Sequence, residues 1–269
     1  MKKAVLNFLF IIVLAVWLFP LFWLVVTSLQ NEQDVMSDTL NLLPARPTLV
    51  NYIKAFSSTD IFTWLFNSFV VSVLTTLGTL VLDMPIAYAL ARIPFKGRRI
   101  VFWLVMAAMM IPFQVILIPL YLQFNQYGLL NTLAGVMLPR LALPIGVFII
   151  KQFYEGVPAA LEEAAFIDGA SRFTTFIQIM VPLGKAAMVT TIIISFINAW
   201  NDFLWPLISV SDSIKYTITV GIANFQGTHG TEYAMIMAGA FIASVPQFIF
   251  YALFRKQIVA GLAMTGIKG

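Results

Sequence analysis

Long apolar runs separated by short polar segments organise this sequence. A helix that crosses the hydrocarbon core of a bilayer needs about 20 mostly apolar residues. Six runs meet that length, so the predicted fold class is an all-α, polytopic membrane protein with six transmembrane helices. The predicted spans are Leu6–Leu29, Phe62–Met84 with a helical continuation to Arg92, Ile100–Phe124, Leu133–Phe153, Ala186–Val210 and Tyr233–Phe254.

The composition supports this interpretation. Of the 269 residues, 60% are hydrophobic and 10% are charged, whereas about 25% of residues are charged in soluble domains. The first run begins with Lys2 and Lys3 like a signal peptide, but its apolar stretch is too long and no small-residue cleavage site follows. We therefore expect this helix to be retained in a single transmembrane domain, residues 1–269. That domain comprises an N-terminal helix 6–29, a core 62–254, a loop 151–185 and a tail 255–269.

Prolines recur inside the predicted spans. A proline removes a backbone donor and bends or breaks a helix, which is tolerated in a membrane where neighbouring groups satisfy the freed carbonyls. We expect structural bends at these positions, with functional hinges as the alternative. The residues are Pro20, Pro112, Pro119, Pro139, Pro144, Pro206 and Pro246, and Gln114 and Gln247 lie close to such bends.

Lysine and arginine gather on one side of the predicted topology. Basic residues near span ends mark the cytoplasmic face, so both termini, the loop 151–185 and the tail are expected in the cytoplasm of a cell-membrane protein. The net charge of +4 is small, and these loops are expected to face lipid and not nucleic acid. The basic residues on this side are Lys2, Lys3, Arg92, Lys96, Arg98, Arg99, Lys151, Arg172, Lys185, Arg255, Lys256 and Lys268; Arg46, Lys54 and Lys215 fall on the other side.

The cytoplasmic loop has the pattern of two helices joined by a turn. Pro158 suits the first turn of a helix, and Glu162 and Glu163 follow near its positive end. Asp168-Gly169 is predicted to end that helix, because glycine adopts the left-handed geometry of a helix terminus. Ser171 can cap a second, amphipathic helix along the membrane surface; its apolar stripe is Phe173, Phe176, Ile177 and Met180, and Pro182 marks entry to the fifth span.

This loop is either an ordinary interfacial segment or a docking protrusion for another protein. Its motif resembles the EAA loop of binding-protein-dependent ABC importer permeases, in the residues Glu163-Ala164-Ala165, Gly169, Ile179 and Pro182. Val181 stands where that family usually has leucine. Other segments resemble maltose-type carbohydrate permeases, in particular the shorter of their two permease subunits; these are Ala87–Arg92 with Phe95–Gly97, Trp200–Asp202, and the tail from Gln257 to Gly269.

The resemblance implies a transport subunit driven by partners: a second homologous permease, two cytoplasmic ATPase subunits and an extracytoplasmic sugar-binding protein. Glu163, Ala164, Ala165, Asp168 and Gly169 would form the ATPase-coupling site. The sequence itself has no G-x-x-x-x-G-K-[ST] motif, so ATP and Mg are expected on the partner ATPase and no cofactor on this chain. With no cysteine and one histidine, His229, we expect no metal site.

Polar residues in the spans predict a substrate path, because polar groups in a membrane usually face the bundle interior. In the fifth span, Asn198, Asn201, Asp202 and Trp205 have the spacing of one helical face. The alternative is that the two asparagines join helices. Arg140, Gln114 and Gln247 are further candidates for the path.

Arg140 lies inside the fourth span and requires a partner. The fourth and fifth spans are antiparallel, and Arg140 and Asp202 fall at similar depth, so we expect them to pair. The alternative is that Arg140 reaches the outer interface. Asp83, near the inner end of the second span, is interpreted as an internal cap or helix contact.

The predicted function is therefore the permease subunit of an ABC importer for a sugar or oligosaccharide. Three alternatives remain open. They are an importer permease for another small solute, a secondary transporter coupled to ions through Asp83 and Asp202, and a membrane anchor or assembly subunit without transport.

Overall fold

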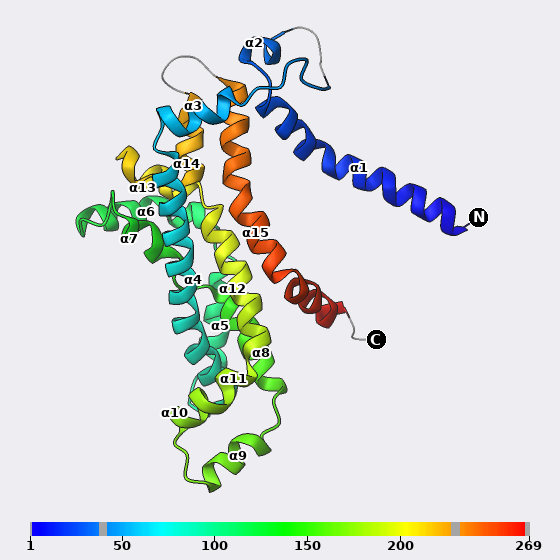
Figure 1. Cartoon of the computed structure of the whole chain (residues 1–269). Coiled ribbons are helices and arrows are strands. Elements are labelled where there is room, and N and C mark those ends of the chain that lie inside the picture. The colour runs from blue at the N-terminus through cyan, green and yellow to red at the C-terminus, as the bar shows by residue number, and fades with distance from the viewer. Residues whose placement is uncertain (1, 38–41, 227–231, 267–269) are drawn as a thin grey trace.

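The computed structural model describes residues 2–37, 42–226 and 232–266, and every regular element in these ranges is helical. Three helices dominate the chain: α1 (Lys2–Ser28), α4 (Ile61–Arg92) and α15 (Tyr233–Gly266) (Figure 1). Each contains a segment that is long and apolar enough to cross a membrane. These helices confirm the expected first, second and sixth apolar helices. α15 continues through most of the expected tail, to Gly266.

The expected third and fourth spans are broken and not continuous. α5 (Arg98–Ala108) and α6 (Phe113–Gln126) meet at a bend of 94°, where Pro112 precedes α6. α7 (Leu133–Met137) and the short helix η1 (Leu138–Arg140) are bent by 45° from α8 (Pro144–Gly156). The predicted bends at Pro112 and Pro144 are confirmed, because each proline lies directly at a break.

The expected fifth span, Ala186–Val210, is wrong in its bounds. α12 (Lys185–Trp200) ends ten residues earlier, and α13 (Leu204–Ser209) follows after a break. On the other side of α12, a bend of 75° at Gly184 separates it from the segment Arg172–Leu183. The described chain thus has three long apolar helices, and six spans if each bent pair counts as one.

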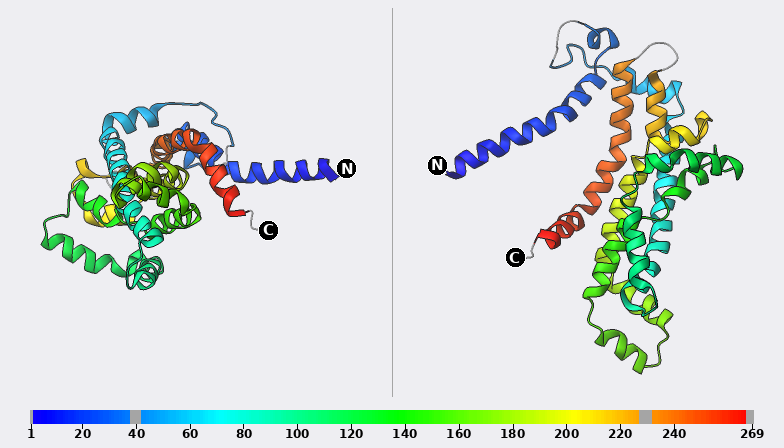
Figure 2. Two further views of the ribbon diagram at one scale, coloured as in Figure 1. Left: turned by 90° about the horizontal axis from the view of Figure 1, so that it is seen from below. Right: turned by 180° about the vertical axis from the view of Figure 1, so that it is seen from behind.

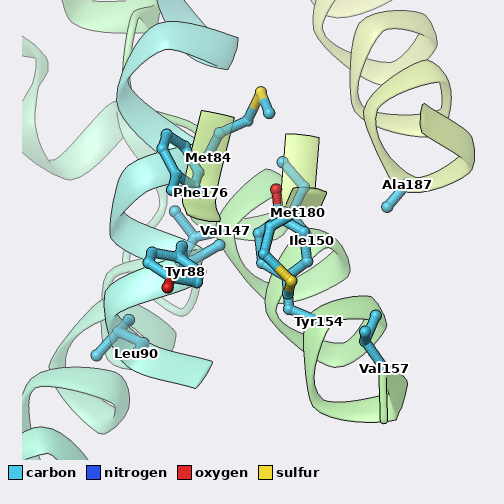
Figure 3. Close-up of a cluster of buried hydrophobic side chains, with 11 residues drawn as sticks. Met84, Tyr88, Leu90, Val147, Ile150, Tyr154, Val157, Phe176, Met180 and Ala187 are labelled. Carbon is cyan, nitrogen blue, oxygen red and sulfur yellow. The ribbon is translucent and has the colours of Figure 1, made fainter. Parts of the chain in front are cut away.

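The central bundle consists of α4, α8 and α12, which pack against one another. One face of α4 carries small polar side chains that are all buried, and Asn67, Ser68, Ser72, Thr75, Thr76, Thr79 and Asp83 make up this polar stripe. Small residues allow close approach of helices in a membrane, where hydrogen bonds replace hydrophobic attraction as the specific contact. Further along α4, the packing becomes apolar: Tyr88 and Leu90 lie with Ile150 and Tyr154 of α8 in one buried cluster (Figure 3).

The two ends of the molecule differ in structure. At one end lie the short helices α2 (Glu32–Val35) and α3 (Val50–Ser58), and at the opposite end lies α9 (Ala160–Ile167) (Figure 1). α1 departs from the bundle and is largely exposed, except near its C-terminal end (Figure 2). The remaining short elements are η3 (Ser213–Lys215), α14 (Ile218–Ala223) and η4 (Asn224–Gln226).

Gly146 of α8 permits close packing of α8 against α4 and α12. A Cβ atom built there would lie against the Asp83 carboxylate of α4 and 2.8 Å from Cγ2 of Thr191 on α12. We expect Gly146→Ala to reduce the free energy of unfolding by about 1–3 kcal/mol, because overpacking displaces helices. A thermal melt of the detergent-solubilised protein measures this effect.

Gly156→Ala is the matched control, because Gly156 is in the same helix and has open space around its Cα. It should be neutral or stabilising by up to about 1 kcal/mol. Equal melting temperatures for the two variants would contradict this account of the bundle.

Candidate functional site

The predicted helix–turn–helix in the loop 151–185 is present. α9 ends at Asp168, and Gly169 adopts φ 81°, the left-handed conformation expected for it. The backbone N–H of Gly169 donates to the carbonyl of Phe166 at 3.1 Å, and that of Ala170 donates to Ala165 at 2.8 Å. This is the Schellman arrangement, so a side chain at position 169 would strain the turn. Pro158 lies just before α9 and not in its first turn, which corrects the expected start.

Most of the predicted coupling residues lie on the surface. Glu163, Ala164, Asp168 and Gly169 are exposed at the end of the molecule, whereas Ala165 is buried. Ala165 therefore packs against the rest of the protein, whereas Glu163 and the turn at Asp168-Gly169 form accessible surface.

The acid that precedes Glu163 has a different position, which the sequence did not indicate. Glu162 is buried; its Oε1 accepts a hydrogen bond from the Tyr88 hydroxyl at 2.9 Å, and its Oε2 lies 3.2 Å from Arg92 Nε. Tyr88 and Arg92 are both on α4, four residues apart, and so share one face of that helix. That spacing is the sequence signal that could have identified them as joint partners of an acid.

The second helix of the loop departs from the expected pattern. Ser171 caps α10 (Arg172–Thr175) as predicted, by accepting a hydrogen bond from the Thr174 N–H at 3.1 Å. The chain then forms a π-helix, η2 (Phe176–Met180), followed by α11 (Val181–Leu183). The predicted single stripe is wrong, because the wider π turn interrupts α-helical spacing. Its members divide into the buried Phe176 and Met180 and the exposed Phe173 and Ile177.

Large apolar side chains are exposed beside the accessible acid. The side chain of Ile167 at the end of α9 is 86% exposed and that of Phe173 is 74% exposed, and both lie outside the predicted spans. An exposed apolar patch next to polar groups is typical of a protein–protein contact. Leu161 and Phe166 extend this patch along α9.

The expected ion pair between Arg140 and Asp202 is confirmed. Arg140 Nε donates to Asp202 Oδ2 at 2.9 Å, and the Arg140 guanidinium lies over the ring of Phe113, 4.0 Å from its centroid. Phe113 begins α6, Arg140 ends η1, and Asp202 lies between α12 and α13. Arg140 and its two partners therefore connect three sites at which helices are interrupted: before α6, after η1, and between α12 and α13.

The predicted polar face of the fifth span is not continuous, because α12 ends at Trp200. Asn198 and Asn201 are exposed, and the Asn201 amide donates to the Ile197 carbonyl at 3.0 Å. Trp205 lies in α13, fully buried, and donates from Nε1 to the Gly135 carbonyl at 2.9 Å. Trp205 therefore holds α13 against α7, while the two asparagines remain accessible.

The other candidates are dispersed. Gln114 is exposed in the first turn of α6, and Gln247 is half-buried in α15; within the described ranges neither makes a hydrogen bond to Arg140 or Asp202. His229 and the side chains of the tail from position 258 lie outside the described residues.

Asp83 is a helix cap, as its interpretation as an internal contact predicted. It is fully buried on α4, and its Oδ1 accepts a hydrogen bond from the backbone N–H of Leu143 at 3.4 Å. Leu143 immediately precedes α8. Asp83 therefore holds the start of α8 where the fourth span breaks.

These features define a class of protein: a multi-pass helical membrane protein with broken spans and an exposed acidic helix at one end. Residues 83–258 match the family of binding-protein-dependent transport system inner membrane components, and the chain belongs to that family. It is therefore an inner-membrane transport component.

Relatives of known role cover nearly the whole chain. It is 35% identical to the arabinooligosaccharides transport system permease protein AraQ of Bacillus subtilis, across 99% of this chain and 96% of that one. It is 34% identical to the trehalose/maltose transport system permease protein MalG of Thermococcus litoralis, across 100% and 98%. A chain of the crystal structure of a bacterial ABC transporter involved in import of the acidic polysaccharide alginate shares the fold. Its TM-score is 0.83, with 21% identity and 95% of each chain covered.

The Arg140–Asp202 pair predicts a charge-swap result. We expect Arg140→Asp or Asp202→Arg alone to reduce the free energy of unfolding by roughly 2–4 kcal/mol, because each leaves two like charges facing each other in the membrane. The double variant should recover part of that loss. A thermal melt in detergent checks the three proteins.

The Lys54–Glu232 pair provides a control, because both of its side chains are well exposed. Glu232→Gln should change the free energy of unfolding by less than about 1 kcal/mol. A double swap no more stable than either single variant would contradict the pairing.

Proposed function

We propose that this chain is one permease subunit of an ATP-driven ABC importer that carries a sugar or oligosaccharide across the inner membrane. With a second, homologous permease it forms the translocation path, and an extracytoplasmic binding protein delivers the solute. The observation that carries this proposal is the exposed acidic helix α9, with its Schellman turn and apolar patch, at the end of the bundle opposite α2 and α3.

The partner that fits α9 is a cytoplasmic ATPase subunit, and an importer of this kind contains two. Glu163 offers a carboxylate to a basic partner group, and the exposed Ile167 and Phe173 add apolar area. ATP and Mg are bound by the ATPase, since this sequence has no phosphate-binding Gly-rich motif. Six spans, with both termini and α9 in the cytoplasm, complete the arrangement.

The carbohydrate assignment rests on relatives and on the chemistry of the bundle. The two relatives compared above are named for arabinooligosaccharides and for trehalose and maltose. The exposed amides of Asn198 and Asn201 are neutral donors and acceptors suited to sugar hydroxyls. The cap made by Asp83 and the ion pair of Asp202 give both acids structural roles, which disfavours their use as ion-coupling groups.

The whole complex tests the function. Purification of the chain with its associated subunits should yield a second permease and an ATPase, and reconstitution with the binding protein should give ATP hydrolysis that one class of sugar stimulates. A panel of di- and oligosaccharides, scored by phosphate release and by uptake into proteoliposomes, measures this. Uptake by the chain alone, without ATP, would contradict the proposal.

The coupling site predicts two loss-of-function variants. Glu163→Arg should weaken ATPase association and lower uptake about tenfold or more, because a charge-reversed contact costs more than one that is only lost. Gly169→Val should do the same by straining the left-handed turn. Co-purification of the ATPase and sugar uptake measure both effects.

Asp60→Arg is the matched charge-reversal control, because Asp60 is an exposed acid at the opposite end of α4. It should retain normal ATPase association. Normal association and uptake in both coupling-site variants would exclude α9 as the docking site.

A further inference from the structure

Two neighbouring glutamates of α9 face different environments. Glu163 is exposed, while Glu162 is 8% exposed and holds two side chains of α4. The Tyr88 hydroxyl donates to Glu162 Oε1 at 2.9 Å, and Arg92 Nε lies 3.2 Å from Glu162 Oε2. Each carboxylate oxygen therefore has its own partner on one face of α4, so a single side chain bridges the two helices.

Arg92 joins a third element to this contact. Its Nη2 donates to the backbone carbonyl of Val157, the C-cap residue directly after α8. A positive charge at the C-terminal end of a helix is favoured by the helix dipole. The arginine therefore fixes the end of α8 and the start of α9 to the same point on α4. Removing one partner of a buried pair leaves the other charge uncompensated, so this contact strongly resists separation.

A second connection between α9 and the bundle runs through α10 and η2. Among the described helices, α10 alone packs closely along α9. The Tyr88 ring then connects the contact to the core, since it lies 5.1 Å from the Phe176 ring of η2 and 6.2 Å from the Tyr154 ring of α8, centroid to centroid (Figure 3). A force on α9 therefore reaches α4 directly through the Glu162 carboxylate and indirectly through α10 and η2.

α4 extends from this contact to the other end of the molecule. It is a single helix of 32 residues, about 48 Å long at 1.5 Å per residue. Nine residues before Arg92, Asp83 holds the start of α8. At the far end, Trp64 Nε1 donates to the Ser213 carbonyl at 2.7 Å, and Asn67 Nδ2 donates to the carbonyls of Ile214 and Tyr216.

We propose that Glu162 is the positioning residue that holds α9 on α4. α4 then carries the displacement of α9 to the break in the fourth span and to the segment 213–216. This inference rests on the proposed function, in which a partner ATPase moves α9. The two acids then have separate tasks: Glu163 meets the partner, and Glu162 passes the movement into the bundle.

Glu162→Gln tests this division in the assembled importer. The amide keeps the volume and can still accept the Tyr88 hydrogen bond, but it loses the charge that pairs with Arg92. ATPase association and hydrolysis should continue, while the number of sugars transported per ATP falls about fivefold. Tyr88→Phe, which removes only the hydroxyl, should lower the same ratio by a smaller factor. Asp60→Asn, at an exposed acid that precedes α4, is the matched control and should leave the ratio unchanged.

A distance measurement distinguishes loss of the contact between α9 and α4 from a general loss of structure. The sequence has no cysteine, so spin labels can be placed at Ala160 of α9, outside the proposed docking residues, and at Ile86 of α4, both exposed. In the unsubstituted protein the interspin distance should be the same without nucleotide and with a non-hydrolysable ATP analogue, because the two helices move together. In Glu162→Gln the distance should broaden and change between the two states.

An unchanged ratio of sugar to ATP in Glu162→Gln, with interspin distances equal to those of the unsubstituted protein, would overturn the inference. So would an interspin distance that already differs between nucleotide states in the unsubstituted protein. A different result would contradict the proposed function: the unsubstituted complex would hydrolyse no ATP in response to sugar. In that case the label distances of the chain in detergent still show whether Glu162 holds α9 on α4.

Discussion

Within a bilayer, every interrupted helix must have its freed polar groups satisfied by protein, and this constraint shapes the structure. Hydrocarbon offers no hydrogen bonds, so irregular backbone survives only where other side chains meet it. Several of the breaks here have a side-chain contact of this kind. Asp83 caps the start of α8, Trp205 donates to the Gly135 carbonyl beneath α13, and Arg140 with Asp202 and Phe113 joins three breaks. The broken spans are therefore fixed at specific points.

The same constraint explains why α4 is central. Its polar stripe is costly in lipid and is stable only when α8 and α12 cover it. An uninterrupted helix that touches both broken neighbours, and that holds Glu162 at one end and the segment 213–216 at the other, is suited to transmit movement. Glu162 and Glu163 are adjacent in the sequence but point in different directions. Glu162 faces the bundle, and Glu163 faces the proposed partner.

Much of this architecture could be predicted from the sequence. Long apolar runs predicted α1, α4 and α15. Asp168-Gly169 and Ser171 predicted the turn in the loop, because these signals are local. Arg140 and Asp202 were predicted to pair because two opposite charges at one depth in adjacent spans have few other partners. The breaks were harder: the sequence stays apolar through Met109–Ile111, and only Pro112 marks the bend.

The prediction of the polar face in the fifth span was wrong because helical spacing was assumed to continue beyond the end of the helix. Asn198, Asn201, Asp202 and Trp205 share one face only if the helix continues, and it stops at Trp200. Glu162 and Glu163 could not be distinguished from their own position in the chain, since the partners of Glu162 lie on α4, far away in the sequence. The most direct measurement of the central claim is labelling of Glu163→Cys with a membrane-impermeant maleimide. Labelling in inside-out vesicles, blocked by the ATPase subunit, is the predicted result; labelling from outside intact cells would contradict it.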